Sequence, residues 1–210
     1  MKYACGDLET TGLDRDRCQI IEMAFVLRDT NNMDEPLESS PAFHCYVKQD
    51  WYEGEPYALA LNARIFEQLG RHDNGKVADA PVYTELEAVE ALKDFFIENG
   101  YKESKNSKRI HFVACGKNFG NFDYQFLRRM DGWEDHFNVS SRMLDPAMLW
   151  MLPSDNRVPG LKPCLKRCGI EKEISHHALE DVFDTIIATE MGLKRLWELT
   201  GELPKELTIN

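Results

Sequence analysis

Two acidic residues one position apart, Asp7 and Glu9, end a short apolar run near the N-terminus. In an extended strand, residues i and i+2 point to the same face, so both carboxylates project together while Leu8 points into a core. Like charges held this close repel and raise each other's pKa, so a fold keeps such a pair because the two share a proton or because a cation lies between them. Hard divalent cations take oxygen ligands, and this pair offers two. A solvated strand end with two surface acids is the alternative, and further carboxylates from elsewhere decide between the two interpretations.

Two later stretches supply such groups. Asp123 lies among aromatic residues just after an apolar, strand-like run, and His176 precedes Asp181 by five residues at the start of a predicted helix. The acid pair, the lone acid and the H-x-A-x-x-D pattern of residues 176–181 resemble, in this order, the DEDDh-type (DnaQ-like) 3′–5′ exonucleases. That superfamily includes proofreading subunits, oligoribonucleases and tRNA-trimming nucleases. Each motif alone is weak, but the three together, over residues 3–192, are a strong signal.

The resemblance implies an α/β domain with the RNase H-like fold, which is a mixed five-stranded sheet flanked by helices. It also implies two divalent metal ions, Mg²⁺ or Mn²⁺, which suit an oxygen-only set of ligands. Asp7 would bridge both ions, and Glu9 and Asp181 would complete the site of the ion that activates water. Asp123 would contribute to the second ion, which stabilises the leaving group.

A histidine completes the implied site. His176 would be the general base for the attacking water, because a neutral imidazole is suited to this role near physiological pH. Its neighbour His177 is the alternative base. The motif spacing favours His176, since Ala178 then occupies the alanine position of the pattern, and His177 is expected at the surface or at the helix start.

The resemblance further implies contacts with the 3′-terminal nucleotide. Leu13 would be wedged against bases, Asn62 would hydrogen-bond the terminal sugar or base, and Asn118 would contact the substrate or a metal-bound water. Leu61 would pack on the same nucleotide, although plain helix packing explains it equally well. The segment next to the acid pair would contribute backbone and side chains, from Thr10, Thr11, Gly12 and Leu13.

Hydrophobic periodicity predicts the elements that position these residues. We expect one domain over residues 1–200 and a loosely held tail over 201–210. Glu22 is the lone acid of the second strand, and it is either a group beside the site or a strand-edge charge. Strands are predicted over 1–8, 18–28, 42–47, 110–116 and 143–145, and helices over 57–69, 81–99, 122–130, 161–168 and 177–191.

The net charge of −11 argues at first against a nucleic-acid partner, because phosphate binding usually accompanies a basic balance. Acids that hold metal ions soften this argument, and so does an uneven charge distribution. Residues 101–130 carry seven bases and two acids. We therefore expect a weak, non-processive grip on a chain end, unless a partner such as a polymerase or repair complex helps in trans.

The lengths of the apolar runs and the composition of the N-terminus bear on the location of the protein in the cell. No apolar run approaches the roughly 20 residues that span a bilayer. The N-terminus lacks the apolar segment of a signal peptide, so a cytoplasmic location is expected.

Cys164 and Cys168 have the spacing of half a zinc site, but no second ligand pair follows. The oligomeric state stays open, with a homodimer as one alternative.

The sequence therefore predicts a two-metal-dependent 3′–5′ exonuclease that releases nucleoside 5′-monophosphates from single-stranded DNA or RNA. Three alternatives remain at this point. They are a catalytically silent binding or polymerase-associated module of the same fold, an endonuclease of this fold, and an RNA-specific oligoribonuclease or trimming enzyme. The choice between DNA and RNA rests on the surroundings of the 2′-hydroxyl, which the sequence does not reveal.

Overall fold

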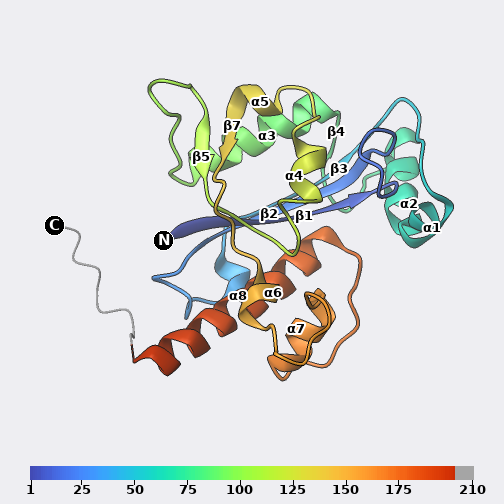
Figure 1. The fold of residues 1–210 in the computed structure, drawn as a ribbon. Coiled ribbons are helices and arrows are strands. Elements are labelled where there is room, and N and C mark those ends of the chain that lie inside the picture. The colour runs from blue at the N-terminus through green and yellow to red at the C-terminus, as the bar shows by residue number, and fades with distance from the viewer. Residues whose placement is uncertain (202–210) are drawn as a thin grey trace.

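A mixed five-stranded sheet forms the centre of the protein in the computed structural model, which describes residues 1–201 (Figure 1). Three antiparallel strands form a meander, and one short strand joins each edge in parallel. This arrangement confirms the predicted fold class. The strand order is β4-β3-β2-β1-β6, with β1 Lys2–Thr10, β2 Ile20–Asp29, β3 Ala42–Val47, β4 Val82–Tyr83 and β6 Ala114–Cys115.

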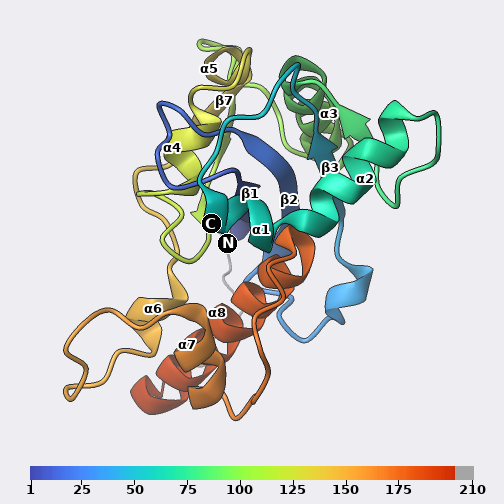
Figure 2. The ribbon, with the colours of Figure 1, turned by 90° about the vertical axis from the view of Figure 1, so that its right-hand side faces the viewer.

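Helices cover both faces of this sheet, as Figures 1 and 2 show. One face packs against α3 (Glu85–Glu98), α4 (Asp123–Leu127), α5 (Trp133–His136) and the small parallel sheet of β5 (Ile110–Phe112) and β7 (Phe137–Val139). The other face packs against α8 (Ala178–Thr200). The remaining helices are η1 Leu37–Ser39, α1 Pro56–Leu61, α2 Ala63–Asp73, α6 Pro146–Leu149 and α7 Leu161–Arg167.

Strand alternation decides which residues of β1 face α8. Tyr3 and Cys5 pack with Val182 of α8, whereas Ala4 and Leu8 belong to the core on the opposite face. Because the side-chain period of a strand is two, the odd-numbered positions of β1 share the α8 face. The metal-ligand pair predicted at positions 7 and 9 therefore points toward the helix that carries the H-x-A-x-x-D pattern.

Several element boundaries differ from the predictions for local reasons. The single helix predicted over 57–69 is divided at Asn62, which leaves helical geometry and bonds the Thr10 carbonyl. Pro81 does not open a helix, because its carbonyl accepts from the Tyr46 amide in the sheet and Thr84 caps α3 instead. The strand predicted over 110–116 divides into β5 and β6, which belong to different sheets.

Two further differences concern the C-terminal half. The strand predicted over 143–145 is reduced to one bridge between Leu144 and Cys115. The last helix runs nine residues beyond its predicted end at Met191, to Thr200, and Gly201 closes it in the left-handed conformation. Residues 202–210 of the predicted tail lie outside the described residues.

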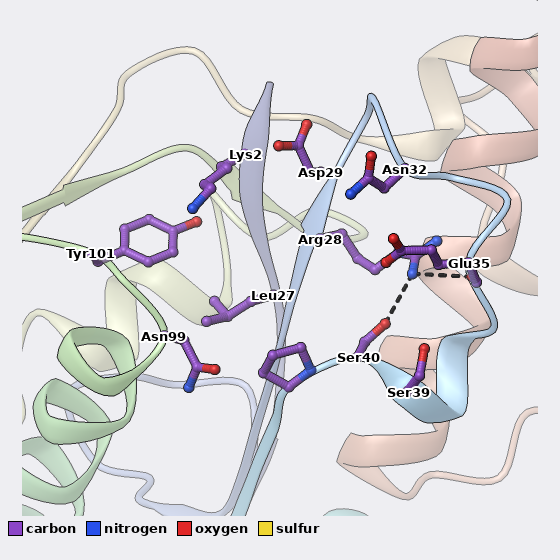
Figure 3. Close-up of a pocket in the computed structure, with 11 residues that line it drawn as sticks. Lys2, Leu27, Arg28, Asp29, Asn32, Glu35, Ser39, Ser40, Asn99 and Tyr101 are labelled. Carbon is purple, nitrogen blue, oxygen red and sulfur yellow. Dashed lines mark hydrogen bonds between the residues drawn. The ribbon is translucent and has the colours of Figure 1, made fainter.

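A buried ion pair joins β2 to α8 at the end of the sheet away from Glu9. Arg28 Nε and Nη2 each donate to one oxygen of Glu190 at 2.8 Å, and the Tyr3 hydroxyl donates to the same carboxylate at 2.8 Å. Arg28 also donates to Ser40 and to the Glu35 carbonyl. It thereby lines a pocket of about 170 Å³ (Figure 3). These contacts indicate that Arg28 stabilises the packing of α8 and of the segment before β3 against β2.

We expect Glu190→Ala to lower the free energy of unfolding by about 3–5 kcal/mol, because it leaves the Arg28 guanidinium buried without its partner. Urea unfolding followed by circular dichroism measures this change. The paired replacement Arg28→Met with Glu190→Met removes both charges and should recover a large part of the loss. A single variant as stable as the parent would contradict this role.

Candidate active site

Asp7 and Glu9 lie near the C-terminal end of β1, and this end of the strand faces the start of α8. Asp7 is opposite Ala24 and Glu9 is opposite Glu22 in the β1–β2 ladder. Asp7 is partly buried and Glu9 is buried. The structure thus places both side chains on the face of the sheet that packs against α8.

Asp123 approaches the pair from a different segment. It is the first residue of α4, it is buried, and its Oδ1 accepts from the Leu8 amide at 3.1 Å. Leu8 is the residue between Asp7 and Glu9, so this bond fixes the Asp123 carboxylate beside both. The neighbouring Phe119 is fully covered in the core and holds this turn in place.

The segment before α8 brings the remaining predicted residues. Ligand atoms of Glu9, His176 and Asp181 all lie within 4.8 Å of one another. Asp181 is buried in the first turn of α8, where Ser175 donates to its Oδ1 at 3.1 Å. His176 is exposed and has a φ of 53°, a left-handed conformation that is uncommon for a residue with a side chain. Such strain clusters at functional sites.

The electrostatics of this cluster are unfavourable without cations. Burial, followed by the charges of Asp123 and Glu9, raises the pKa of Asp7 well above its ordinary value. Burial and then the charge of Glu22 raise the pKa of Glu9 to about 8. Burial raises the pKa of Asp123 to about 7, and burial also raises the pKa of Asp181. Crowded, buried oxygen ligands of one sign fit hard divalent cations.

Glu22 proves to be the centre of a buried network rather than a strand-edge charge. It is fully buried and accepts from His44 Nε2 at 2.7 Å, Arg64 Nη2 at 3.0 Å and the Ala178 amide at 3.1 Å. His177 Nδ1 lies 3.5 Å from the same carboxylate. Burial alone would raise the pKa of Glu22, but these hydrogen bonds and charges together lower it. Glu22 therefore stays ionised.

This network holds the start of α8 against the sheet. Ala178 is the first residue of the helix, and His177, the residue before it, makes no side-chain cap. The Glu22 carboxylate supplies the missing cap from β2, beside Glu9. Glu22 thereby sets the distance between the β1 acids and the segment of His176 and Asp181. The sequence signal for this role is weak, since it consists of one acid in an otherwise apolar strand.

The segment after the acid pair is placed beside the site, with one difference from expectation. Thr10 is buried and its hydroxyl donates to the Gly12 carbonyl at 2.7 Å, while Leu13 is 75% exposed. Thr11 is fully buried, and its hydroxyl donates to the Glu53 carbonyl and accepts from the Gln19 amide. The Thr11 side chain thus has no surface for a nucleotide and instead anchors a loop.

The other predicted substrate contacts surround the same end of β1. Asn62 is buried, its amide donates to the Thr10 carbonyl at 3.1 Å, and its Oδ1 has no partner among residues 1–201. Leu61, on the turn before it, is 39% exposed. Asn118 is exposed with a φ of 61°, and its amide donates to Asp145, the cap of α6. Asp145 accordingly orders the loop that precedes Asp123.

No protein-family model matches the sequence, and no curated protein matches it either. Solved structures do share its fold. Cell-death related nuclease 4 (CRN-4) superposes with a TM-score of 0.61 at 12% identity, over 92% of this chain and 64% of its own. E. coli exonuclease I in complex with a dT13 oligonucleotide gives a TM-score of 0.60 at 20% identity, over 95% of this chain and 42% of its own.

The nuclease domain of 3′hExo, described as a DEDDh family member bound to rAMP, is similar along nearly its whole length. Its TM-score is 0.61 at 15% identity, over 96% of this chain and 94% of that domain. This chain therefore spans less than two thirds of CRN-4 and of exonuclease I but almost all of the 3′hExo domain. No helix among residues 1–201 is long and apolar enough to cross a membrane. The chain has the fold of the DEDDh exonucleases.

Proposed function

We propose that this chain is a two-metal-dependent 3′–5′ exonuclease that hydrolyses single-stranded DNA or RNA ends to nucleoside 5′-monophosphates. The observation that carries the proposal is the meeting of four carboxylates from three segments with His176 at one end of β1. The shared fold of known nucleases supports it. Structural ion pairs do not explain these acids, because Asp7 and Glu9 have no cationic side chain within salt-bridge distance among residues 1–201.

The acids would hold the metal ions in the arrangement that the sequence motifs imply. Asp7 would bind both ions, Glu9 and Asp181 the first, and Asp123 the second. When bound, two divalent ions supply an activated water and neutralise charge on the phosphate and on the leaving oxygen. Bound cations would also remove the repulsion that raises the pKa of Asp7 and Glu9.

His176 would take the proton from the attacking water. Its exposure and its place beside Glu9 and Asp181 support this role, because an exposed imidazole there can reach a water near the scissile phosphate. His177 is less suited to this role, because its Nδ1 faces the Glu22 carboxylate and it directly precedes the first residue of α8. We therefore propose that His176 is the base and that His177 is part of the Glu22 network.

The terminal nucleotide would lie between the end of β1 and α1. The Asn62 Oδ1 is a buried acceptor without a partner in the described part of the chain, and such groups are costly unless a ligand or water satisfies them. A sugar hydroxyl or a base amine of the substrate can donate to it. Leu61 and Leu13 each expose apolar surface, against which bases can stack.

The deciding experiment is a time course on 5′-labelled single-stranded DNA and RNA of equal sequence, with Mg²⁺, Mn²⁺ or a chelator. We expect a ladder that shortens from the 3′ end, only with metal present. Circular single strands should stay intact, because an exonuclease cannot begin on them, and their cleavage would indicate an endonuclease. If neither linear strand is cleaved under any metal, the chain is a binding module of this fold.

A further inference from the structure

We infer that a groove between the β1–β2 loop and α4 binds the sugar-phosphate backbone of the single strand upstream of the scissile phosphate. This inference rests on the proposed function and names the path of its substrate. Two adjoining hollows of about 240 and 270 Å³ form the groove. Leu13 and Phe122 line the first, Arg128 and Arg129 line the second, and Arg15 and Gln125 line both.

One end of this groove, which we call the arginine groove, meets the candidate active site. Phe122 directly precedes Asp123, and Leu13 follows the acid pair by four residues. The proposed pocket for the terminal nucleotide lies beside Asn62 and α1, near the end of β1. Figures 1 and 2 show that α1 and α4 lie apart from each other. A strand whose last nucleotide occupies that pocket therefore leaves the site past Leu13, along the arginine groove.

The groove offers three guanidinium groups to a polyanion. Arg15 Nη1 donates to the neutral amide oxygen of Gln125 at 3.1 Å and has no acidic partner among residues 1–201. Arg129 pairs with Asp16 at 2.7 Å, and Arg128 pairs with Glu134 at 2.8 Å. Guanidinium groups bind phosphate oxygens in a bidentate manner, which suits this row to a backbone rather than to bases.

Three acids, Asp14, Asp16 and Glu134, also line the groove, and they do not block it. Asp14 is exposed and accepts from the Asp16 amide at 3.0 Å. Both ion pairs are about half exposed, and exposed pairs contribute only about 0–1 kcal/mol. Phosphates can therefore replace Asp16 and Glu134 at small cost. The lysines of α7 are a natural comparison, because Lys162 and Lys166 are also exposed and also paired with acids, but the hollow that they line contains neither Leu13 nor Phe122.

Salt dependence tests this inference directly. For single strands, the logarithm of affinity falls with the logarithm of salt concentration, with a slope of about −0.7 for each phosphate contacted. We would measure binding of a labelled 12-nucleotide strand to the Asp7→Asn protein by fluorescence anisotropy between low and moderate salt. Adding Arg15→Gln, Arg128→Gln and Arg129→Gln together should weaken binding at least tenfold at low salt and reduce the slope by about 2.

A dinucleotide and two matched variants complete the design. The only phosphate of a dinucleotide is the scissile one, so the kcat/KM of the triple arginine variant on it should match the parent. On the 12-nucleotide strand, KM should rise at least fivefold while kcat stays within twofold. Lys162→Gln with Lys166→Gln should change neither quantity, and Asp16→Asn should tighten binding because it frees Arg129.

The outcomes separate the two proposals. Parental salt slopes and parental KM values in the triple arginine variant would overturn the groove, whatever the chemistry of the site. An absence of metal-dependent turnover on both substrates would overturn the proposed function, while the anisotropy slopes would still report on the groove. Circular dichroism of each variant confirms that the exposed substitutions leave the fold intact.

Discussion

Asp7→Asn should reduce kcat/KM by at least about 10³-fold and at the same time stabilise the metal-free protein. Stabilisation of transition-state charge by bound metal is worth several kcal/mol, and each 1.36 kcal/mol is a factor of ten in rate. The same substitution removes the carboxylate that is raised in pKa by burial and by Asp123, Glu9 and Asp181. We expect about 1–3 kcal/mol of added stability at pH 8 in chelator.

The pH dependence of metal-free stability follows from the same pKa shifts. The folded pKa values of about 8 for Glu9 and about 7 for Asp123 lie above the ordinary values near 4 of unfolded chains. The folded state thus binds protons more tightly, so this contribution to stability is complete below pH 4 and is lost as pH rises through 7 and 8. Urea unfolding in chelator should show this decline, and saturating Mn²⁺ should reverse it.

Glu180→Gln is the matched control for both measurements. Glu180 is an exposed acid in the same turn of α8 as Asp181, and among residues 1–201 its side chain makes no hydrogen bond or ion pair with the cluster. We expect parental turnover and a parental pH profile from it. Parental turnover in Asp7→Asn would show that Asp7 is not a metal ligand. A loss of stability in chelator would show that the charge of Asp7 does not destabilise the metal-free fold.

Glu22→Ala should have the second largest effect, on stability and on turnover together. It removes the buried acidic partner of Arg64, which keeps only the Tyr46 hydroxyl and the more distant Asp79, and it also removes the cap from Ala178 and frees His44. Breaking a buried charged network costs about 3–5 kcal/mol. Because the segment of His176 and Asp181 loses its anchor, kcat should fall by about 10–100-fold, as is typical of groups that orient metal ligands.

The conservative variant distinguishes positioning from general destabilisation. Glu22→Gln keeps an oxygen that can accept from the Ala178 amide, so it should recover most of kcat while KM stays near the parental value. Glu190→Ala, which is destabilised by a similar amount at the other end of the sheet, should keep parental kcat at temperatures where it is folded. Equal losses of kcat in Glu22→Gln and Glu22→Ala would show that the charge itself, and not the cap, is required.

The sequence was sufficient to predict the meander, α8 and the convergence of the acids, because each depends on local alternation or on motif order. The i, i+2 spacing of Asp7 and Glu9 determines their shared face once β1 is a strand. It was not sufficient for the role of Glu22, because its four neighbours come from β3, α2 and the start of α8. Contacts between segments so far apart in the chain leave no periodic signal.

Contacts between distant segments also explain why two element boundaries differ from the predictions. Residues 110–116 read as one strand because Val113, between β5 and β6, is apolar like its neighbours, yet the two halves pair with β7 and β1 respectively. Asn62 lies within a helical pattern of apolar residues, but its side chain donates to the Thr10 carbonyl of β1 and its backbone leaves helical geometry. In each case a tertiary hydrogen bond, rather than intrinsic propensity, decided the local conformation.

The bond between Asp123 and the Leu8 amide also bears on which substitution best tests this residue. The parallel ladder between β1 and β6 ends at Cys5 and Cys115, so without Asp123 the buried amide of Leu8 would have no acceptor from β6. A buried donor left without an acceptor costs about 1–3 kcal/mol. Replacing Asp123 with alanine would therefore remove a proposed metal ligand and weaken the fold at the same time. Asparagine, whose carbonyl can still accept from Leu8, separates the two effects.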